Sequence, residues 1–165
     1  FFNSPTEETN LKNSLKTIPL FNDLTKGDLT SLIKIIHNRT YVAGEFIFHQ
    51  GDPGIGLYII RDGEVEIERE NAHKVKKVLA TFTKGDFFGE LALVDGEKRS
   101  ASAIAKSACK VSVIFKPDLD EFIEKYPRKG IKILTGISNI LALRLRKLNE
   151  DYFDLQYNVQ EEKGK

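Results

Sequence analysis

The stretch from Thr40 to Phe115 consists of short runs of β-branched and aromatic residues, with turn residues about every ten positions. The runs are EFIFHQ, GLYIIR, GEVEIE, KVKKVLATF, SASAIA and KVSVIF, and Gly, Asp and Pro residues separate them. Short strands with regularly spaced turns are typical of an all-β sandwich or barrel. In EVEIE, Val65 and Ile67 alternate with glutamates, so one face of that strand is apolar. We therefore expect an antiparallel β roll in this stretch.

Helical patterns flank the expected roll. Before it, Thr25 can cap a helix, and Asp28 three residues later completes a capping box. Apolar residues then follow at helical spacing: Leu29, Leu32, Ile33 and Ile36. After the roll, DLDEFIEKYP predicts a short helix that Pro127 ends. The expected fold class is mainly β with flanking helices (α+β): a β sandwich or barrel with N-terminal helices and a long C-terminal helix.

The long C-terminal helix is predicted by an apolar stripe beyond Pro127. Its members recur at steps of three and four residues, which suits a helix packed along its length: Leu134, Ile137, Leu141, Leu145, Leu148, Tyr152 and Leu155. A helix of about 25 residues would be about 38 Å long, which is more than a small β domain can cover. We therefore expect part of the stripe to pair with a second copy of the chain and form a homodimer.

Length and composition indicate one globular domain of 165 residues, with 41% hydrophobic and 30% charged residues. We divide it into an N-terminal extension (1–14), a β-roll core with its leading helix (15–116), C-terminal helices that serve as lid and dimerisation element (117–157), and a tail expected to fray (158–165). The chain starts with Phe and contains no Met, which indicates a processed product or an excised part of a longer protein.

Several classes of function are disfavoured. The net charge of +1 gives no general attraction to nucleic acid or membrane, and no apolar run reaches the about 18 residues of a membrane span. The single Cys109 forms no internal disulfide, so the cytoplasm is the expected location. His37, His49 and His73 are scattered, so we expect no metal site and no cofactor. The glycines match neither the Rossmann nor the P-loop pattern.

Residues 85–105, GDFFGELALVDGEKRSASAIA, place an acid and a base in an apolar segment. A short strand, then one helical turn beginning near Gly89, would present free backbone N–H groups to an anion. Arg99 adds a forked, permanently charged donor for phosphate oxygens, and Ser100 adds a hydroxyl. Glu90 would repel a phosphate, so its useful role is to accept hydrogen bonds from neighbouring hydroxyls. A ribose phosphate needs both an anion site and a hydroxyl acceptor.

This segment resembles the phosphate-binding cassette of the cyclic nucleotide-binding domain family, which includes bacterial catabolite activators and protein kinase A regulatory subunits. The residues that carry the resemblance are FGELALVDGEKRSASAIA. It extends to PLFNDLTKGDLTSLI, to GEFIFHQGDPGIGLYIIRDGEVEI and to the long final helix. The resemblance covers about residues 15–155 and implies an antiparallel β jelly-roll sandwich.

The resemblance implies roles for the cassette residues. Glu90 would bind the ribose 2′-hydroxyl and Arg99 the cyclic phosphate. Backbone amides near Leu91 and Ala101, with the hydroxyl of Ser100, would complete the phosphate contacts.

The resemblance also implies contacts outside the cassette. Ile67 and Leu79 would pack around purine and ribose, Arg144 would pair with the cassette glutamate, and Asn149 would meet the purine edge. Leu148 stands where a catabolite activator has a hydroxyl residue, so base recognition can differ. The candidate ligand-binding residues are Gly89, Glu90, Leu91, Ala92, Arg99, Ser100, Ala101, Ile67, Leu79, Arg144 and Asn149.

Other interpretations remain open at this point. Glu90 and Arg99 could form an internal salt bridge that pins a loop, or the site could have lost its ligand or bind another effector. The segment from Arg128 to Lys147 holds six basic residues and no acidic one, which fits a solvated helix face or a partner surface.

The expected function is a non-enzymatic receptor for a 3′,5′-cyclic nucleotide, with cyclic AMP first and cyclic GMP second, because Ser100 does not decide between them. A sensory fragment of a larger transcription regulator, channel or kinase is an alternative, and a cyclic nucleotide hydrolase is another. About ten residues follow Leu155, too few for a helix-turn-helix domain, so we expect no direct DNA binding by this chain.

Overall fold

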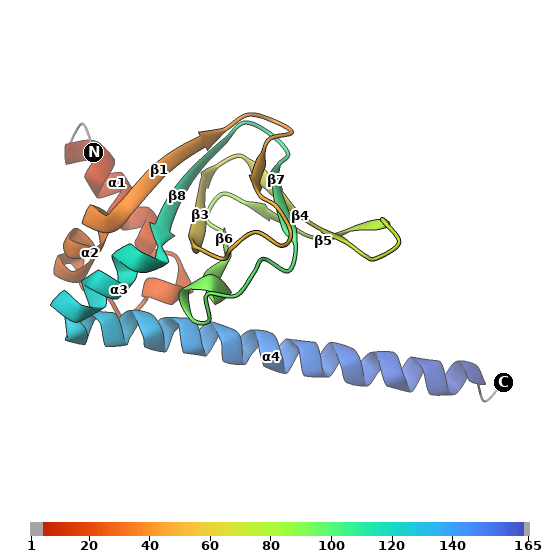
Figure 1. Ribbon diagram of the computed structural model, residues 1–165. Coiled ribbons are helices and arrows are strands. Elements are labelled where there is room, and N and C mark those ends of the chain that lie inside the picture. The colour runs from red at the N-terminus through yellow and green to blue at the C-terminus, as the bar shows by residue number, and fades with distance from the viewer. Residues whose placement is uncertain (1–4, 164–165) are drawn as a thin grey trace.

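The structure is a computed structural model that describes the backbone of residues 5–163 and the side chains of residues 5–157. Helices precede and follow a roll of eight strands (Figure 1). The strands are β1 (Ile36–Tyr41), β2 (Phe46–Phe48), β3 (Gly56–Asp62), β4 (Glu64–Glu70), β5 (Lys76–Thr83), β6 (Phe87–Phe88), β7 (Ser102–Ala105) and β8 (Cys109–Phe115). The helices are α1 (Pro5–Lys16), η1 (Pro19–Phe21), α2 (Lys26–Leu32), η2 (Ile33–Ile35), η3 (Glu90–Leu93), α3 (Lys116–Lys125) and α4 (Pro127–Lys163).

The roll consists of two antiparallel four-stranded sheets, in the orders β1-β8-β3-β6 and β2-β7-β4-β5. Its interior is an apolar cluster that includes Tyr58, Val65, Phe88 and Val113. A second cluster joins the helices to the first sheet and contains the fully buried Leu11 and residues of α2, α3 and α4. The predicted fold class is confirmed.

The N-terminal helices form as the capping pattern predicts. The Thr25 hydroxyl accepts the Asp28 N–H at 3.1 Å, and the Asp28 carboxylate accepts the Thr25 N–H at 3.0 Å, so the capping box is complete. Ile36, however, does not belong to this helix. The helical turn ends at Ile35, and Ile36 pairs with Ile114 as the first residue of β1. The polar sequence of this edge strand, IHNRTY, gives no alternation signal.

The N-terminal extension and the tail also differ from expectation. Helix α1 spans Pro5–Lys16, so it includes much of the expected extension (1–14) and the first two residues of the expected core. Its Leu11 and Leu15 are fully buried. At the other end α4 has 37 residues rather than about 25 and includes residues 158–163 of the tail. The fraying expected of the tail stays a prediction. Residues 164–165 lie outside the described part of the chain.

The first half of α4 packs on the domain, and its second half extends past the roll (Figure 1). Ile133, Ile137 and Ile140 are buried, and a Cβ at Gly136 would lie 2.1 Å from the Leu20 carbonyl oxygen. Further along the stripe the side chains are exposed, Leu145 to 58% and Tyr152 to 60%.

Candidate functional site

The cassette begins where β6 turns into η3 at Gly89. This residue has a φ of 79°, in the left-handed region that glycine adopts without strain. A Cβ there would lie 2.8 Å from Nη1 of Arg99 and 2.9 Å from the Gly56 carbonyl oxygen. Both the backbone conformation and the close approach of the guanidinium therefore require glycine at this position.

Arg99 is a buried cation, 8% exposed. Its Nη2 donates to the Gly56 carbonyl at 2.8 Å and its Nη1 to the Gly89 carbonyl at 3.2 Å. Nε is buried and has no hydrogen-bond partner, and among the described residues no carboxylate forms an ion pair with this side chain. Burial lowers the pKa of Arg99 from its usual value, as expected for a charge removed from water. The guanidinium thus retains donor capacity for an anion.

Glu90 is more deeply buried, at 3% exposure, and its Oε1 forms an ion pair with Nη1 of Arg144 from α4. Burial lowers the pKa of Arg144, whose side chain is still 46% exposed. The interpretation in which Glu90 and Arg99 form a salt bridge is therefore wrong. The carboxylate is bound by Arg144 of the C-terminal helix, and Arg99 has no counterion among the described residues.

These groups border a cavity of about 400 Å³, within the range of small-molecule sites. Charged and small residues of the cassette line one part of it. An apolar part is lined by side chains of four strands: Phe48, Ile67, Phe82 and Phe88. The arrangement can hold a ligand that has an anionic end, a hydroxyl-bearing middle and a flat apolar end.

Nine of the predicted ligand-binding residues line this cavity: Gly89, Glu90, Leu91, Ala92, Arg99, Ser100, Ala101, Ile67 and Arg144. Leu79 and Asn149 do not. Ala80 pairs with Ile67 and Val78 with Glu68, so Leu79 is the unpaired extra residue of β5, and its side chain is 53% exposed. Asn149 is exposed on the part of α4 that lies beyond Arg144.

Sequence reasoning missed six residues that line the cavity: Phe48, Phe82, Phe88, Asp95, Glu97 and Lys98. The phenylalanines were treated only as strand formers. A signal was available, because three aromatic residues on strands that face one interior provide a surface for a flat ring system. Asp95 and Glu97 belong to a turn, within which Asp95 accepts the Glu97 N–H at 3.0 Å.

The basic segment Arg128–Lys147 is neither a uniform solvated face nor a free patch. Three of its six cations are bound inside the molecule: Lys129 donates to Ser31, Lys132 pairs with Asp28, and Arg144 pairs with Glu90. These contacts fasten α4 to α2 and to the cassette.

Within the described residues, no group of three or more His, Cys, Asp or Glu side chains is arranged to hold a metal ion. The described helices include none that is long and apolar enough to cross a membrane. Cys109 is buried, and its thiol donates to the Glu64 and Ser107 carbonyls at 3.2 Å.

Comparison with protein families decides the relationship. Residues 38–126, more than half of the chain, match the family described as the cyclic nucleotide-binding domain. The chain belongs to this family. As a cyclic nucleotide-binding domain it is 32% identical over 133 residues to the cyclic AMP receptor protein of Thermus thermophilus, which covers 81% of this chain and 60% of that protein.

Regulatory proteins of eukaryotes are similar as well. The cAMP-dependent protein kinase regulatory subunit of Hypocrea atroviridis is 34% identical over 105 residues, 64% of this chain and 22% of the subunit. The chain thus spans less than two thirds of the length of these curated relatives.

Solved structures agree in fold. The catabolite activator protein of Thermus thermophilus aligns with a TM-score of 0.74 and 30% identity, covering 84% of this chain and 63% of that one. A cyclic nucleotide-binding domain from Methylobacillus flagellatus aligns with a TM-score of 0.76 and 25% identity, covering 86% and 80%. Architecture and family thus agree with the expectation drawn from the cassette.

Proposed function

We propose that this domain is a sensory module that binds a 3′,5′-cyclic nucleotide, cyclic AMP in the first place and cyclic GMP in the second, in the cavity between cassette and roll. The observation that carries the proposal is Arg99. It is a buried guanidinium that lines a cavity of about 400 Å³, has no carboxylate partner among the described residues and has a buried Nε without a hydrogen-bond partner. A buried cation without a counterion is costly, so an anionic ligand supplies what the site lacks.

The remaining contacts follow from the lining of the cavity. The cyclic phosphate meets Arg99, Ser100 and the backbone near Leu91 and Ala101. The ribose hydroxyl donates to Glu90, whose Oε1 is bound by Arg144 and whose Oε2 forms no hydrogen bond with the described residues. The purine packs on the apolar lining, which includes Ile67 and the three phenylalanines.

Signalling requires that the ligand bind two positions of the C-terminal helices unequally. In our proposal the phosphate neutralises Arg99 and orders the cassette, and Glu90 transmits the change to α4 through Arg144. Because α4 is a continuous helix from Pro127 to Lys163, a small rotation near Arg144 moves its far end by several ångströms. The ligand thereby changes what the exposed half of α4 presents.

We further propose that two copies associate through the exposed stripe of α4 and that the domain works in the cytoplasm, as part of a larger regulator such as a transcription factor, channel or kinase. No catalytic role is proposed.

The test is isothermal titration of the purified chain with cyclic AMP, cyclic GMP and 5′-AMP, with chromatography of the cyclic AMP sample afterwards. We expect micromolar or tighter binding of a cyclic nucleotide, no binding of 5′-AMP, and no AMP formed. Silence from all three nucleotides would refute the proposal, and release of AMP would refute the non-catalytic role.

A further inference from the structure

The Arg99 guanidinium is surrounded by neutral groups. Two backbone carbonyls accept from its Nη atoms, and two aromatic rings lie against it. Asp52 lies near enough to influence its pKa but forms no ion pair with it. The carboxylate of Asp52 instead accepts the backbone N–H of His49 at 2.8 Å. The positive charge of Arg99 is thus stabilised by carbonyl oxygens and aromatic rings, and not by a counterion among the described residues.

Phe48 lies closest to that charge. The Cζ atom of Arg99 lies 4.2 Å from the centre of the Phe48 ring and 5.5 Å from that of Tyr58. Both distances are within the about 6 Å over which a ring face attracts a cation, and the attraction is strongest when water is excluded. Arg99 is 8% exposed, so the contact with Phe48 is largely desolvated.

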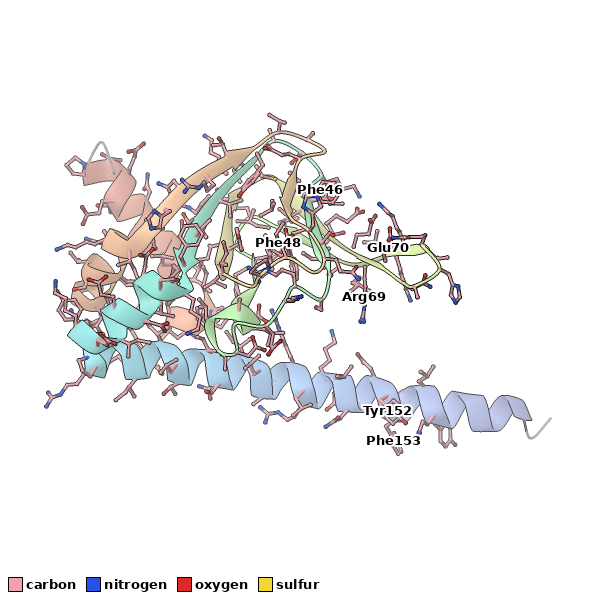
Figure 2. The ribbon with its side chains drawn as sticks, in the orientation of Figure 1. Phe46, Phe48, Arg69, Glu70, Tyr152 and Phe153 are labelled. Atoms are coloured by element: carbon pink, nitrogen blue, oxygen red, sulfur yellow. The ribbon has the colours of Figure 1, made fainter. Side chains whose placement is uncertain are left out.

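A register shift in β2 directs Phe48 inward. Phe46 pairs with Ile104 and Phe48 with Ala103, so two residues of β2 correspond to a single step along β7, as in a β-bulge. In a regular strand the two phenylalanines would share a face. Here Phe46 is 38% exposed and stacks on His49, whereas Phe48 packs with Tyr58 and Phe88 inside the roll (Figure 2).

A ring and a carboxylate would have different consequences at this place. A carboxylate would stabilise Arg99 but would repel a phosphate and compete with it for the same donors. The negative face of a ring stabilises the cation without neutralising it and accepts no conventional hydrogen bond. The Nε and the remaining Nη protons then stay available.

We propose that Phe48 is a positioning residue that holds the Arg99 guanidinium over its ring in place of a counterion, and so keeps it ready for an anion. This inference rests on the proposed function for the nature of that anion, and on the distance between ring and guanidinium for the contact itself. It assigns Phe48 a role beyond filling the apolar end of the cavity.

The experiment replaces Phe48 by 4-fluoro-, 3,5-difluoro- and 3,4,5-trifluorophenylalanine through site-specific incorporation. Fluorine changes the ring volume little but progressively weakens the negative potential of its face. We expect the unfolding equilibrium constant of the ligand-free protein to rise stepwise, by about 5- to 30-fold between phenylalanine and the trifluoro ring. The dissociation constant for cyclic AMP should rise along the same series, because Arg99 is released from its pocket-facing position.

Two controls separate charge attraction from packing. The unfolding series of the protein without ligand should be flat in an Arg99→Gln background, because no cation then faces the ring. The series at Phe21, which is fully buried and forms no aromatic or cation contact with the described residues, should also be flat.

The proposal would be overturned if the unfolding equilibrium constant did not change along the series at Phe48, or if it changed equally in the Arg99→Gln background. So would a stepwise loss of stability with an unchanged dissociation constant, since the ring would then serve the fold alone. If the wild-type protein bound no cyclic nucleotide, the proposed function would fail, while the unfolding series, which needs no ligand, would still decide whether Phe48 holds Arg99.

Discussion

Arg99 and Glu90 border one cavity with opposite charges, and neither neutralises the other. Glu90 is bound by Arg144 from α4, and Arg99 is held by two carbonyls and the ring of Phe48. The separation matters because a salt bridge between them would have to break before a ribose phosphate could bind. Each group instead keeps free hydrogen-bonding capacity on the cavity side.

The role of Glu90 can be isolated with a ligand that lacks its partner. In the wild-type protein, 2′-deoxy-cyclic AMP should bind about 10- to 150-fold more weakly than cyclic AMP, the value of a hydrogen bond to a charged group. In Glu90→Gln that preference should largely disappear, because the charged acceptor is gone. Titration of both ligands into wild type and Glu90→Gln gives the four dissociation constants that are compared. An undiminished preference in Glu90→Gln would remove Glu90 from the ribose site.

The site residues of the cassette could be predicted because they are consecutive and chemically distinctive. Gly89, Glu90 and Arg99 stand out in an apolar segment, and all three line the cavity. Phe48 could not be assigned in this way, because its inward direction depends on the register shift in β2. Leu79 lies outside the lining of the cavity for a similar reason, because it is the extra residue of an irregular β5. Where apolar residues are consecutive, as in FIF and VLA, the alternation pattern does not show a register shift.

Among the elements, α4 is held to the rest of the domain by residues of its first half. Gly136 packs against the backbone of η1, Lys132 pairs with Asp28 of α2 at 2.7 Å, and Arg144 reaches the cassette. The start of α2 after the Thr25 cap and the end of α3 before Pro127 could be predicted from the sequence. The close packing of Gly136 on Leu20 could not be predicted, because the sequence does not indicate which residue packs against a glycine within a helix.

A substitution at Gly136 tests this contact. Alanine is the better helix former, so Gly136→Ala would stabilise a free helix by about 1 kcal/mol. Here the new methyl group would lie 2.1 Å from the Leu20 carbonyl oxygen, so we expect net destabilisation of about 1–3 kcal/mol. Gly27→Ala in α2 is the matched control, because a Cβ there has its nearest neighbour at 3.8 Å. Urea unfolding should rank Gly27→Ala at or above wild type and Gly136→Ala below it; the reverse order would contradict the packing.

The pair between α2 and α4 makes a pH prediction. Burial raises the pKa of Asp28, but hydrogen bonds from Lys132 and from Thr25 lower it by more, so the pKa lies below its ordinary value of 3.8. A carboxyl with a lowered folded-state pKa stabilises the fold above the ordinary pKa, and the stabilisation is lost as pH falls through the folded-state pKa.

Asp28→Asn keeps an amide oxygen for the capping box and removes the charge. At pH 7 it should cost about 1–2 kcal/mol, because the Lys132 side chain is partly exposed. The difference from wild type should shrink as pH falls below 3.8. Denaturant unfolding across this range measures it, and a difference independent of pH would show that the ion pair contributes nothing.

In the molecule as a whole, the distal half of α4 projects beyond the roll with apolar side chains on its surface (Figure 1). The length of the apolar stripe could be predicted from the sequence. Its exposure could not, because it depends on where the roll ends along α4. Leu145 and Leu148 are 58% and 64% exposed, which is why we propose that a second copy covers them.

Sedimentation tests this association. Wild type should sediment as a dimer at micromolar concentration, and Leu148→Asp should sediment as a monomer because it places a charge within the stripe. Leu143→Asp is the matched control, since Leu143 is similarly exposed at 58% and lies about 140° away around the helix. A monomeric wild type, or equal dissociation by both variants, would argue against the stripe as the interface.

The central claim is that Arg99 binds the phosphate of a cyclic nucleotide in the cavity it borders. The direct measurement is isothermal titration of cyclic AMP into wild type, Arg99→Ala and, as control, Arg146→Ala, which removes an exposed arginine of α4. We predict that Arg99→Ala weakens binding about 10- to 150-fold and that Arg146→Ala leaves it unchanged. Equal affinity in wild type and Arg99→Ala, with both proteins folded, would contradict the account.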